Sequence, residues 1–295
     1  MADGETSSGR SLGGLRERLP SDRFEAERLA DDLVREHRFE IAVVFPLVGA
    51  VLLLASAEGL LPEPLAFNPW LVLSGVLVMR SPLLAGVFPL MTRRATAGVL
   101  ALCGYAYAVE YVGIQTGFPY GEFYYGVDLG PTVGGVPLGL PVFFLPLVMN
   151  AYLLCLLLLG PSADSRARRL VSVILVVLLM DVVLDPGAVA LGFWVYPNGG
   201  AFYGVPLSNY AGWVVSATLT VFVMDAAFDH AALRARLERC AFMLDDLVSF
   251  VILWGGVNAV YGNWIPVLVA VGLGAGLLRT ERFDADLLGA VGVGR

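Results

Sequence analysis

Long apolar segments alternate with short polar connections along most of the chain, and this pattern predicts an all-α membrane protein. Each segment is close to the ~20 residues that a helix needs to cross a bilayer. Eight can be drawn, at 41–61, 70–91, 95–115, 141–160, 169–191, 209–229, 244–260 and 262–278. We therefore expect about eight transmembrane helices in one domain, 41–278, between an N-terminal arm, 1–40, and a tail, 279–295.

The connections differ in arginine content, and this difference predicts how the helices are oriented. Arginines occupy the arm, the tail and the connections at 92–94, 161–168 and 230–243. The connections at 62–69, 116–140, 192–208 and 261 have none. By the positive-inside rule both termini are cytoplasmic, in a multi-pass protein of the cell membrane. If the last two segments formed one helix, the arginine-bearing tail would lie outside, so we count eight. The mixed-charge segment Asp22–Glu40 is expected to be a cytoplasmic helix or a partly disordered arm.

Composition excludes several classes of membrane protein. Of the 295 residues, 57% are hydrophobic and 15% charged, so the membrane domain fills most of the chain. All 19 basic residues are arginine, and without lysine no retinal Schiff base can form. The three cysteines are far apart, and His37 and His230 fall at cytoplasmic edges, so we expect no disulfide framework, metal site or cofactor. The net charge of −7 and the absence of lysine suit a protein from a salt-rich, GC-rich source.

Carboxylates within the apolar segments are the first candidates for function, because an ionised carboxylate in lipid is costly. They are Glu110, Asp181, Asp185, Asp225 and Asp229. Acids close to the segment ends are expected to be solvated, and these are Glu58, Asp229, Asp245 and Asp246.

Glu110, Asp181 and Asp185 are expected to form a layer in the outer half of the bilayer. Helix rise places Glu110 roughly 8 Å and Asp185 roughly 9 Å below the outer end of their outward-running segments. Asp181 lies one turn deeper on the same helix face as Asp185, and two carboxyls that close do not both ionise cheaply. Pro186 is expected to break the helix and to expose backbone groups to a polar cavity. The alternative is that these acids only hold helices together.

Arg80 is a further charge inside a segment, near the middle of the second one. We expect it to be the counter-ion of one of these three carboxylates, with Asn150 in the same network, and to contact the substrate. A purely structural ion pair is the alternative.

Two outward-running segments are followed by similar sequences. Seven residues after Glu110 come Gly117 and Phe118, then Tyr120, Phe123–Gly126 and Gly135–Leu138; seven after Asp185 come Gly192 and Phe193, then Tyr196 and Ala201–Leu207. We interpret this as a duplication of helices 3–4 and 5–6, whose halves would meet at a shared site. Ordinary aromatic belts explain the aromatics but not the matched spacing.

The connections that follow are rich in aromatic side chains and lack Lys and Arg, which suits a long apolar substrate rather than phosphate or nucleic acid. Aromatic faces can also stabilise a carbocation. The residues expected to contact the substrate are Arg80, Tyr120, Trp194, Tyr203, Asn209 and Trp213. A protonated carboxylic acid, aromatic walls and access for water together predict acid-catalysed addition of water to an alkene.

Two blocks, EYVGIQTGFPYGEFYYG (110–126) and DVVLDPGAVALGFWVYPNGGAFYGVPLSNYAGW (181–213), resemble the multi-pass membrane proteins of carotenoid biosynthesis. Within that family the resemblance is to haloarchaeal enzymes that hydrate C50 carotenoids. It implies that water adds to the terminal double bonds of bisanhydrobacterioruberin to give bacterioruberin. It also implies that the desaturase and elongase of the same pathway are partners of this protein.

The roles of the acids are hypotheses drawn from the residues themselves. Asp185, or its neighbour Asp181, would protonate the alkene to a tertiary carbocation. Glu110 would help to stabilise the cation, with Tyr203 and Trp213, and then take a proton from the attacking water. This chemistry needs no cofactor.

Three other functions fit parts of the sequence. A prenyltransferase would use DVVLD (181–185) and DAAFD (225–229), but these acids are expected at opposite sides of the membrane. A carotenoid or lipid cyclase begins with the same protonation, and product mass separates it because only hydration adds water. A non-enzymatic carotenoid-binding scaffold would have the same aromatic cavity, and a null mutant that accumulates unhydrated carotenoid would argue against it.

Overall fold

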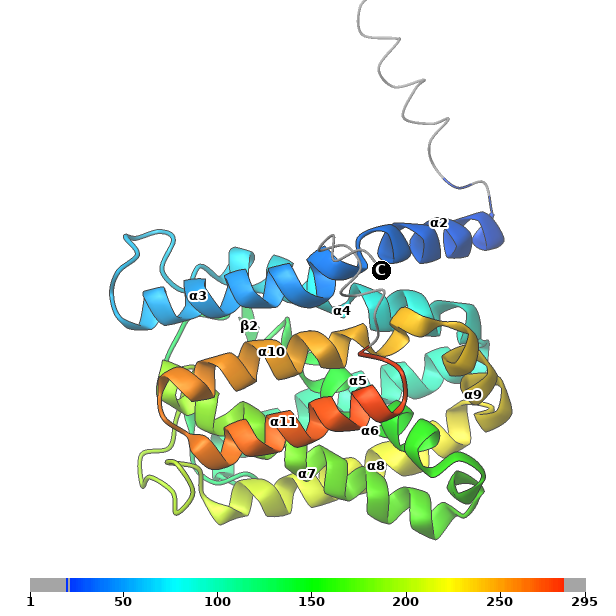
Figure 1. Cartoon of the computed structure of the whole chain (residues 1–295). Helices are drawn as coiled ribbons and strands as arrows, with labels where there is room; N and C mark the ends of the chain where they lie inside the picture. The colour runs from blue at the N-terminus through cyan, green and yellow to red at the C-terminus, as the bar shows by residue number, and fades with distance from the viewer. Residues whose placement is uncertain (1–19, 21, 284–295) are drawn as a thin grey trace, which may run out of the picture.

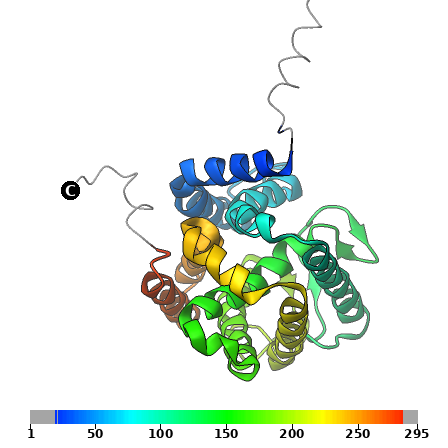
Figure 2. The same cartoon turned by 90° about the vertical axis from the view of Figure 1, so that its right-hand side faces the viewer.

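The computed structural model describes residue 20 and residues 22–283, which form a bundle of long helices lying side by side (Figures 1 and 2). The apolar helices are α3 (Phe45–Ala57), α4 (Pro69–Val87), α5 (Arg93–Thr116), α6 (Leu140–Leu159), α7 (Arg166–Leu191), α8 (Leu207–Ala227), α10 (Asp245–Val260) and α11 (Trp264–Arg279). A π-helical segment, Glu40–Val44, precedes α3. Short turns of tighter helix, at Phe88–Leu90, Gly160–Asp164 and Ala241–Leu244, adjoin α4, α6 and α10.

Seven helices in the described part of the chain are long and apolar enough to cross a membrane, which confirms an all-α, multi-pass membrane protein. Each predicted segment coincides with one apolar helix. The last of them, α11, is apolar but has 16 residues, which is about 24 Å of helix. A count of eight spans therefore stays a prediction.

The polar helices gather at one end of the bundle. The arm forms α2 (Arg23–Glu36), whose N-terminus is capped by the Asp22 carboxylate, so a helix within Asp22–Glu40 is confirmed. Figure 1 places α2, α9 (His230–Arg239) and the C-terminal end of α11 at this same end. The remainder of the predicted arm and tail, residues 1–19, 21 and 284–295, lies outside the described residues.

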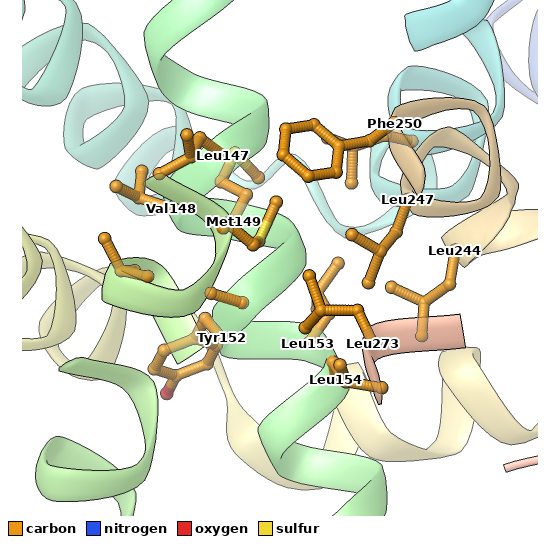
Figure 3. Close-up of a cluster of buried hydrophobic side chains, with 14 of the residues drawn as sticks. Leu147, Val148, Met149, Tyr152, Leu153, Leu154, Leu244, Leu247, Phe250 and Leu273 are labelled. Carbon is orange, nitrogen blue, oxygen red and sulfur yellow. The ribbon is translucent and has the colours of Figure 1, made fainter. Parts of the chain in front are cut away.

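The interior of the bundle is built around α6. This helix contacts α4, α5, α7, α8, α10 and α11. Figure 3 shows Met149, Leu153 and Leu154 of α6 packed toward Leu247 and Phe250 of α10 and Leu273 of α11. In the span that contains α6, 67% of residues are buried, against 17% in α5. A helix that is apolar on all sides belongs in the interior, whereas α5 presents most of its surface to lipid.

Two acids at the start of α10 are fully buried, so the prediction that they are solvated is wrong. Asp245 and Asp246 are each 0% exposed. Arg38 Nε donates to Asp245 at 2.7 Å, and Arg80 pairs with Asp246. Arginines distant in sequence reach this helix end only in the tertiary structure, which is why hydropathy misplaced the acids. Glu58 and Asp229 are exposed, as predicted.

The connection that follows α5 and the connection that follows α7 pair with each other. β1 (Tyr124–Tyr125) and β4 (Trp194–Val195) form a short antiparallel ladder between them. In the first connection, β2 (Thr132–Val133) and β3 (Val136–Pro137) are joined by a two-residue turn; in the second, Phe202 and Val205 bridge another. Both central residues have positive φ in each turn, namely 62° and 86° at Gly134 and Gly135, and 50° and 83° at Tyr203 and Gly204. The repeated sequence thus has a repeated turn geometry, while its origin by duplication stays a prediction.

Candidate functional site

Two carboxyls of α7 are bridged by an amide of α8. Asn209 Nδ2 lies 2.8 Å from Asp181 Oδ2 and 2.5 Å from Asp185 Oδ2. The two aspartates are one helical turn apart, so they project from the same face of α7 toward the start of α8. Both are buried, at 0% and 3% exposure. Asn209 was predicted to contact substrate, and its role in bridging the acids was not foreseen because it depends on the packing of α7 against α8.

Pro186 does not break α7, which continues to Leu191, so that prediction is wrong. Backbone carbonyl groups close to Pro186 instead accept hydrogen bonds from buried side-chain amides. Asn258 Nδ2 donates to Val183 O at 2.7 Å, and Asn263 Nδ2 donates to Pro186 O at 3.4 Å. Side chains of α10 and of the turn before α11 thus hydrogen-bond backbone carbonyls close to the proline.

Each acid of the two repeats receives a hydrogen bond from a tyrosine of its own outer connection. The Tyr125 hydroxyl donates to Glu110, and the Tyr196 hydroxyl lies 3.5 Å from Asp185 Oδ2. Burial, followed by the charge of the adjacent acid, raises the pKa of Tyr125 and of Tyr196. Both phenols therefore stay protonated and act as donors. The spacing from each acid to its tyrosine differs, 15 residues against 11, so the repeat alone did not identify these partners.

A cavity of about 490 Å³ joins the acids to a largely apolar interior. It is bounded by α3, α4, α5, α6, α7, α8 and α10 and by the connections between them, and Glu110 and Asp185 both line it. Glu110 and Asp185 each lie six residues before the end of their helix, which puts both at about 9 Å below that end. Predicted site residues on its wall are Arg80, Glu110, Tyr120, Asp185, Trp194, Asn209 and Trp213. Asp181 is not among the lining residues and meets the site through Asn209.

Aromatic rings form the wall between α6 and α8. Trp213 stacks on Phe144 with a centroid separation of 5.2 Å and an interplanar angle of 21°, and Tyr120 packs against Trp213 at 5.8 Å. The Tyr120 hydroxyl is held by Ser216 at 2.7 Å. A Cβ at Gly212 would lie 2.4 Å from the Tyr120 ring, so glycine is what lets this ring approach α8. The π faces are thereby fixed rather than mobile.

Tyr203 does not line the cavity. It is 36% exposed, occupies the turn between Phe202 and Val205, and its hydroxyl lies 3.4 Å from the Ile265 amide nitrogen. The prediction that it faces the substrate has no support in this geometry. In the second repeat the tyrosine that meets the acid is Tyr196.

Arg80 is not the counter-ion of the outer acids, so that prediction is wrong. It pairs with Asp246, whose other oxygen accepts from Asn150 Nδ2 at 2.6 Å. Asn150 does belong to the network of Arg80, as predicted. Within residues 22–283, Glu110, Asp181 and Asp185 form no ion pair with an arginine.

Asp225 is part of an ionic network at the opposite end of the bundle. Arg169 Nε donates to it at 2.8 Å, and so does the Tyr152 hydroxyl, also at 2.8 Å. These bonds tie α6, α7 and α8 together near α9. DAAFD and DVVLD therefore do not converge on one site, and no cluster of three metal-binding side chains is found in the part of the chain that the structure describes.

The chain was compared with known proteins. The sequence model of the family described as "Carotenoid biosynthesis protein" matches residues 67–277. The chain belongs to this family. It is 62% identical over 270 residues to the protein named bisanhydrobacterioruberin hydratase from Haloarcula japonica, which covers 91% of this chain and 92% of that relative. No solved structure matches. The family predicted from the two sequence blocks is confirmed.

Proposed function

We propose that this membrane protein is a carotenoid hydratase that adds water to the terminal double bonds of bisanhydrobacterioruberin and so forms bacterioruberin. The relative from Haloarcula japonica supports the substrate and the reaction, because it aligns over nearly the whole of both chains. The observation in the structure that carries the mechanism is a set of buried carboxyls, without arginine partners among the described residues, at one end of an apolar cavity.

Asp185 is the proton donor in this proposal. It lines the cavity, whereas Asp181 does not, and a carboxyl buried beside another carboxyl favours its neutral form. Its proton adds to one alkene carbon, and the other carbon becomes a tertiary cation. Trp213 and Tyr120 present π faces on the same wall, which lowers the energy of that cation.

Glu110 is the proton acceptor. Water attacks the cation through its oxygen, a C–O bond forms, and the proton released goes to the Glu110 carboxylate, which Tyr125 orients. Return of one proton from Glu110 to Asp185, through water in the shared cavity, completes a cycle whose net change is the addition of one H₂O. Steps of this general acid–base type contribute about 10²–10⁴-fold to a rate.

The fold supports a topology for this site. We infer that eight helices cross the membrane, α11 included, and that both termini face the cytoplasm, because arginines gather at the end that carries α2 and α9. The carboxyls then lie beneath the outer surface.

The substrate entrance lies between α3 and α4. The cavity is lined there by Val48, Leu52 and Leu71, which are about half exposed, so a polyene could enter from the lipid between these helices. The desaturase and elongase of the pathway are the expected partners.

The test is to express the chain in a host that makes bisanhydrobacterioruberin and to determine the mass of the products. We expect products heavier by one water and then by two. A product of unchanged mass would indicate a cyclase, and a dependence on magnesium and a prenyl diphosphate would indicate a prenyltransferase. Accumulation of unmodified substrate beside intact protein would leave only the binding scaffold.

A further inference from the structure

The cavity has a second polar end, away from the carboxyls. Arg80 of α4 and Asn150 of α6 both line it. Arg80 is 11 residues and Asn150 is 10 residues from the outer start of its helix, which puts them about 15–17 Å below those starts. The carboxyls lie at about 9 Å by the same measure. This inner end is therefore roughly 6–8 Å deeper than the reacting groups.

Asp246 holds both side chains in a defined orientation. One of its oxygens accepts from Arg80 Nη1 and the other from Asn150 Nδ2 at 2.6 Å. Arg80 Nε is directed to Val142 O at 3.4 Å. Because the amide nitrogen of Asn150 is committed to a carboxylate, its Oδ1 must be the free acceptor.

Two polar atoms of this cluster have no hydrogen-bond partner among the described residues. Asn150 Oδ1 is buried and accepts no hydrogen bond from the described residues. Arg80 Nη2 likewise has no protein partner in residues 22–283, and the Arg80 side chain is 11% exposed. An ion pair that only joined helices would be expected to have its buried polar atoms satisfied. A hydroxyl group both donates and accepts, so it can use a free acceptor and a free donor of one cluster.

We propose that Asn150 and Arg80 form a hydroxyl-binding subsite. It selects a polyene whose end group already carries a hydroxyl, roughly 6–8 Å from the alkene to be hydrated. The hydroxyl donates to Asn150 Oδ1 and accepts from Arg80 Nη2, while the alkene lies at Asp185. This inference rests on the proposed function, because it takes the occupant of the cavity to be a polyene. Water is the other hydroxyl source that could satisfy the same two atoms.

The test uses two synthetic polyenes with the same isopropylidene terminus, one with a tertiary alcohol on the end group and one with its methyl ether. The ether can accept from Arg80 but cannot donate to Asn150. Quenching of tryptophan fluorescence in the purified, detergent-solubilised protein reports binding, because Trp213 and Trp254 line the cavity. We expect the wild type to bind the alcohol about tenfold more tightly than the ether, and Asn150→Leu to bind both equally.

Ser74→Ala is the matched control. Ser74 lines the cavity on α4, but its hydroxyl already bonds Leu71 O at 3.1 Å, so the preference for the alcohol should survive its removal. Arg80→Lys keeps the charge beside Asp246 and removes the second guanidinium donor. It should weaken binding of both polyenes by the same factor and keep the preference, which provides a second measurement if Asn150→Leu fails to fold.

Equal binding of alcohol and ether by the wild type would overturn the proposal and assign the two atoms to water. The proposal would also be overturned if Asn150→Leu still preferred the alcohol. It would be overturned as well if Arg80→Lys bound both polyenes as tightly as the wild type. Product mass is measured separately on the same samples. Selective binding of the alcohol without any hydrated product would reject the hydratase and leave the subsite standing.

Discussion

The two ends of the cavity contain buried carboxyls in opposite circumstances. At the inner end, Asp246 meets the guanidinium of Arg80 and the amide of Asn150. At the other end, Asp181 and Asp185 meet each other and the Asn209 amide, and Glu110 meets the Tyr125 phenol, with no arginine partner among the described residues. A carboxylate paired with arginine joins helices, whereas Asp185, buried beside a second carboxyl and without an arginine partner among the described residues, can give away a proton. Burial alone does not distinguish a structural acid from a catalytic one. The side chain that pairs with the acid does.

The sharpest test of this difference is Asp185→Asn, which removes the proton and keeps the shape of the side chain. We expect hydration to fall by at least about 10²–10⁴-fold, the contribution of a general acid, with little change in thermal stability. Bacterioruberin in a host that supplies the unhydrated carotenoid is the readout, together with protein recovered from the membrane. Asp181→Asn, at the acid that does not line the cavity, should have a smaller effect. Hydration at the wild-type rate by Asp185→Asn would exclude Asp185 as the acid.

The same substitution at the inner end, Asp246→Asn, should act on stability instead. It leaves the Arg80 charge buried without its carboxylate, a loss that typically costs about 3–5 kcal/mol. The midpoint of thermal unfolding in detergent should drop sharply, in contrast to Asp185→Asn. Replacing both partners, Arg80→Leu with Asp246→Leu, should restore most of the loss because no unpaired charge remains. Equal midpoints for the two asparagine variants would contradict the distinction drawn between the two ends.

Asn209→Leu tests whether the bridge between the aspartates matters for turnover. It removes both hydrogen bonds from Nδ2, to Asp181 and to Asp185. Since a hydrogen bond to a neutral carboxyl is worth about 0.5–1.5 kcal/mol, we expect kcat to fall by up to about tenfold. KM should change less, because the aromatic wall is untouched. An increase in KM alone would assign Asn209 to substrate binding only.

The smallest effect is expected at the outer tyrosines, where Tyr196→Phe and Tyr203→Phe form a matched pair. Tyr196 lies 3.5 Å from Asp185 Oδ2, a long hydrogen bond, so its loss should lower turnover about two- to fivefold. Tyr203 is 36% exposed and does not line the cavity, so its phenylalanine variant should be as active as the wild type. A larger loss at Tyr203 than at Tyr196 would place the substrate in the outer turn.

Much of the fold was predictable because membrane helices depend on local composition. Every apolar segment became a helix, since a backbone in lipid must satisfy its own hydrogen bonds, and the two blocks around Glu110 and Asp185 identified the family. The depth of those two acids also followed from the sequence, because helix rise is constant and both helices end at a glycine seven residues later.

Pairing between helices was decided only by the tertiary structure. Arg80 could reach several carboxylates from its position in α4, and only the packing of α4 against α10 assigned it to Asp246. Packing of α8 against α7 placed Asn209 between the two aspartates, and the shape of an outer turn carried Tyr203 away from the cavity. Sequence thus determined which segments form apolar helices and how far Glu110 and Asp185 lie from the ends of theirs. Which side chain meets which depends on contacts between segments far apart along the chain, and no local pattern encodes them.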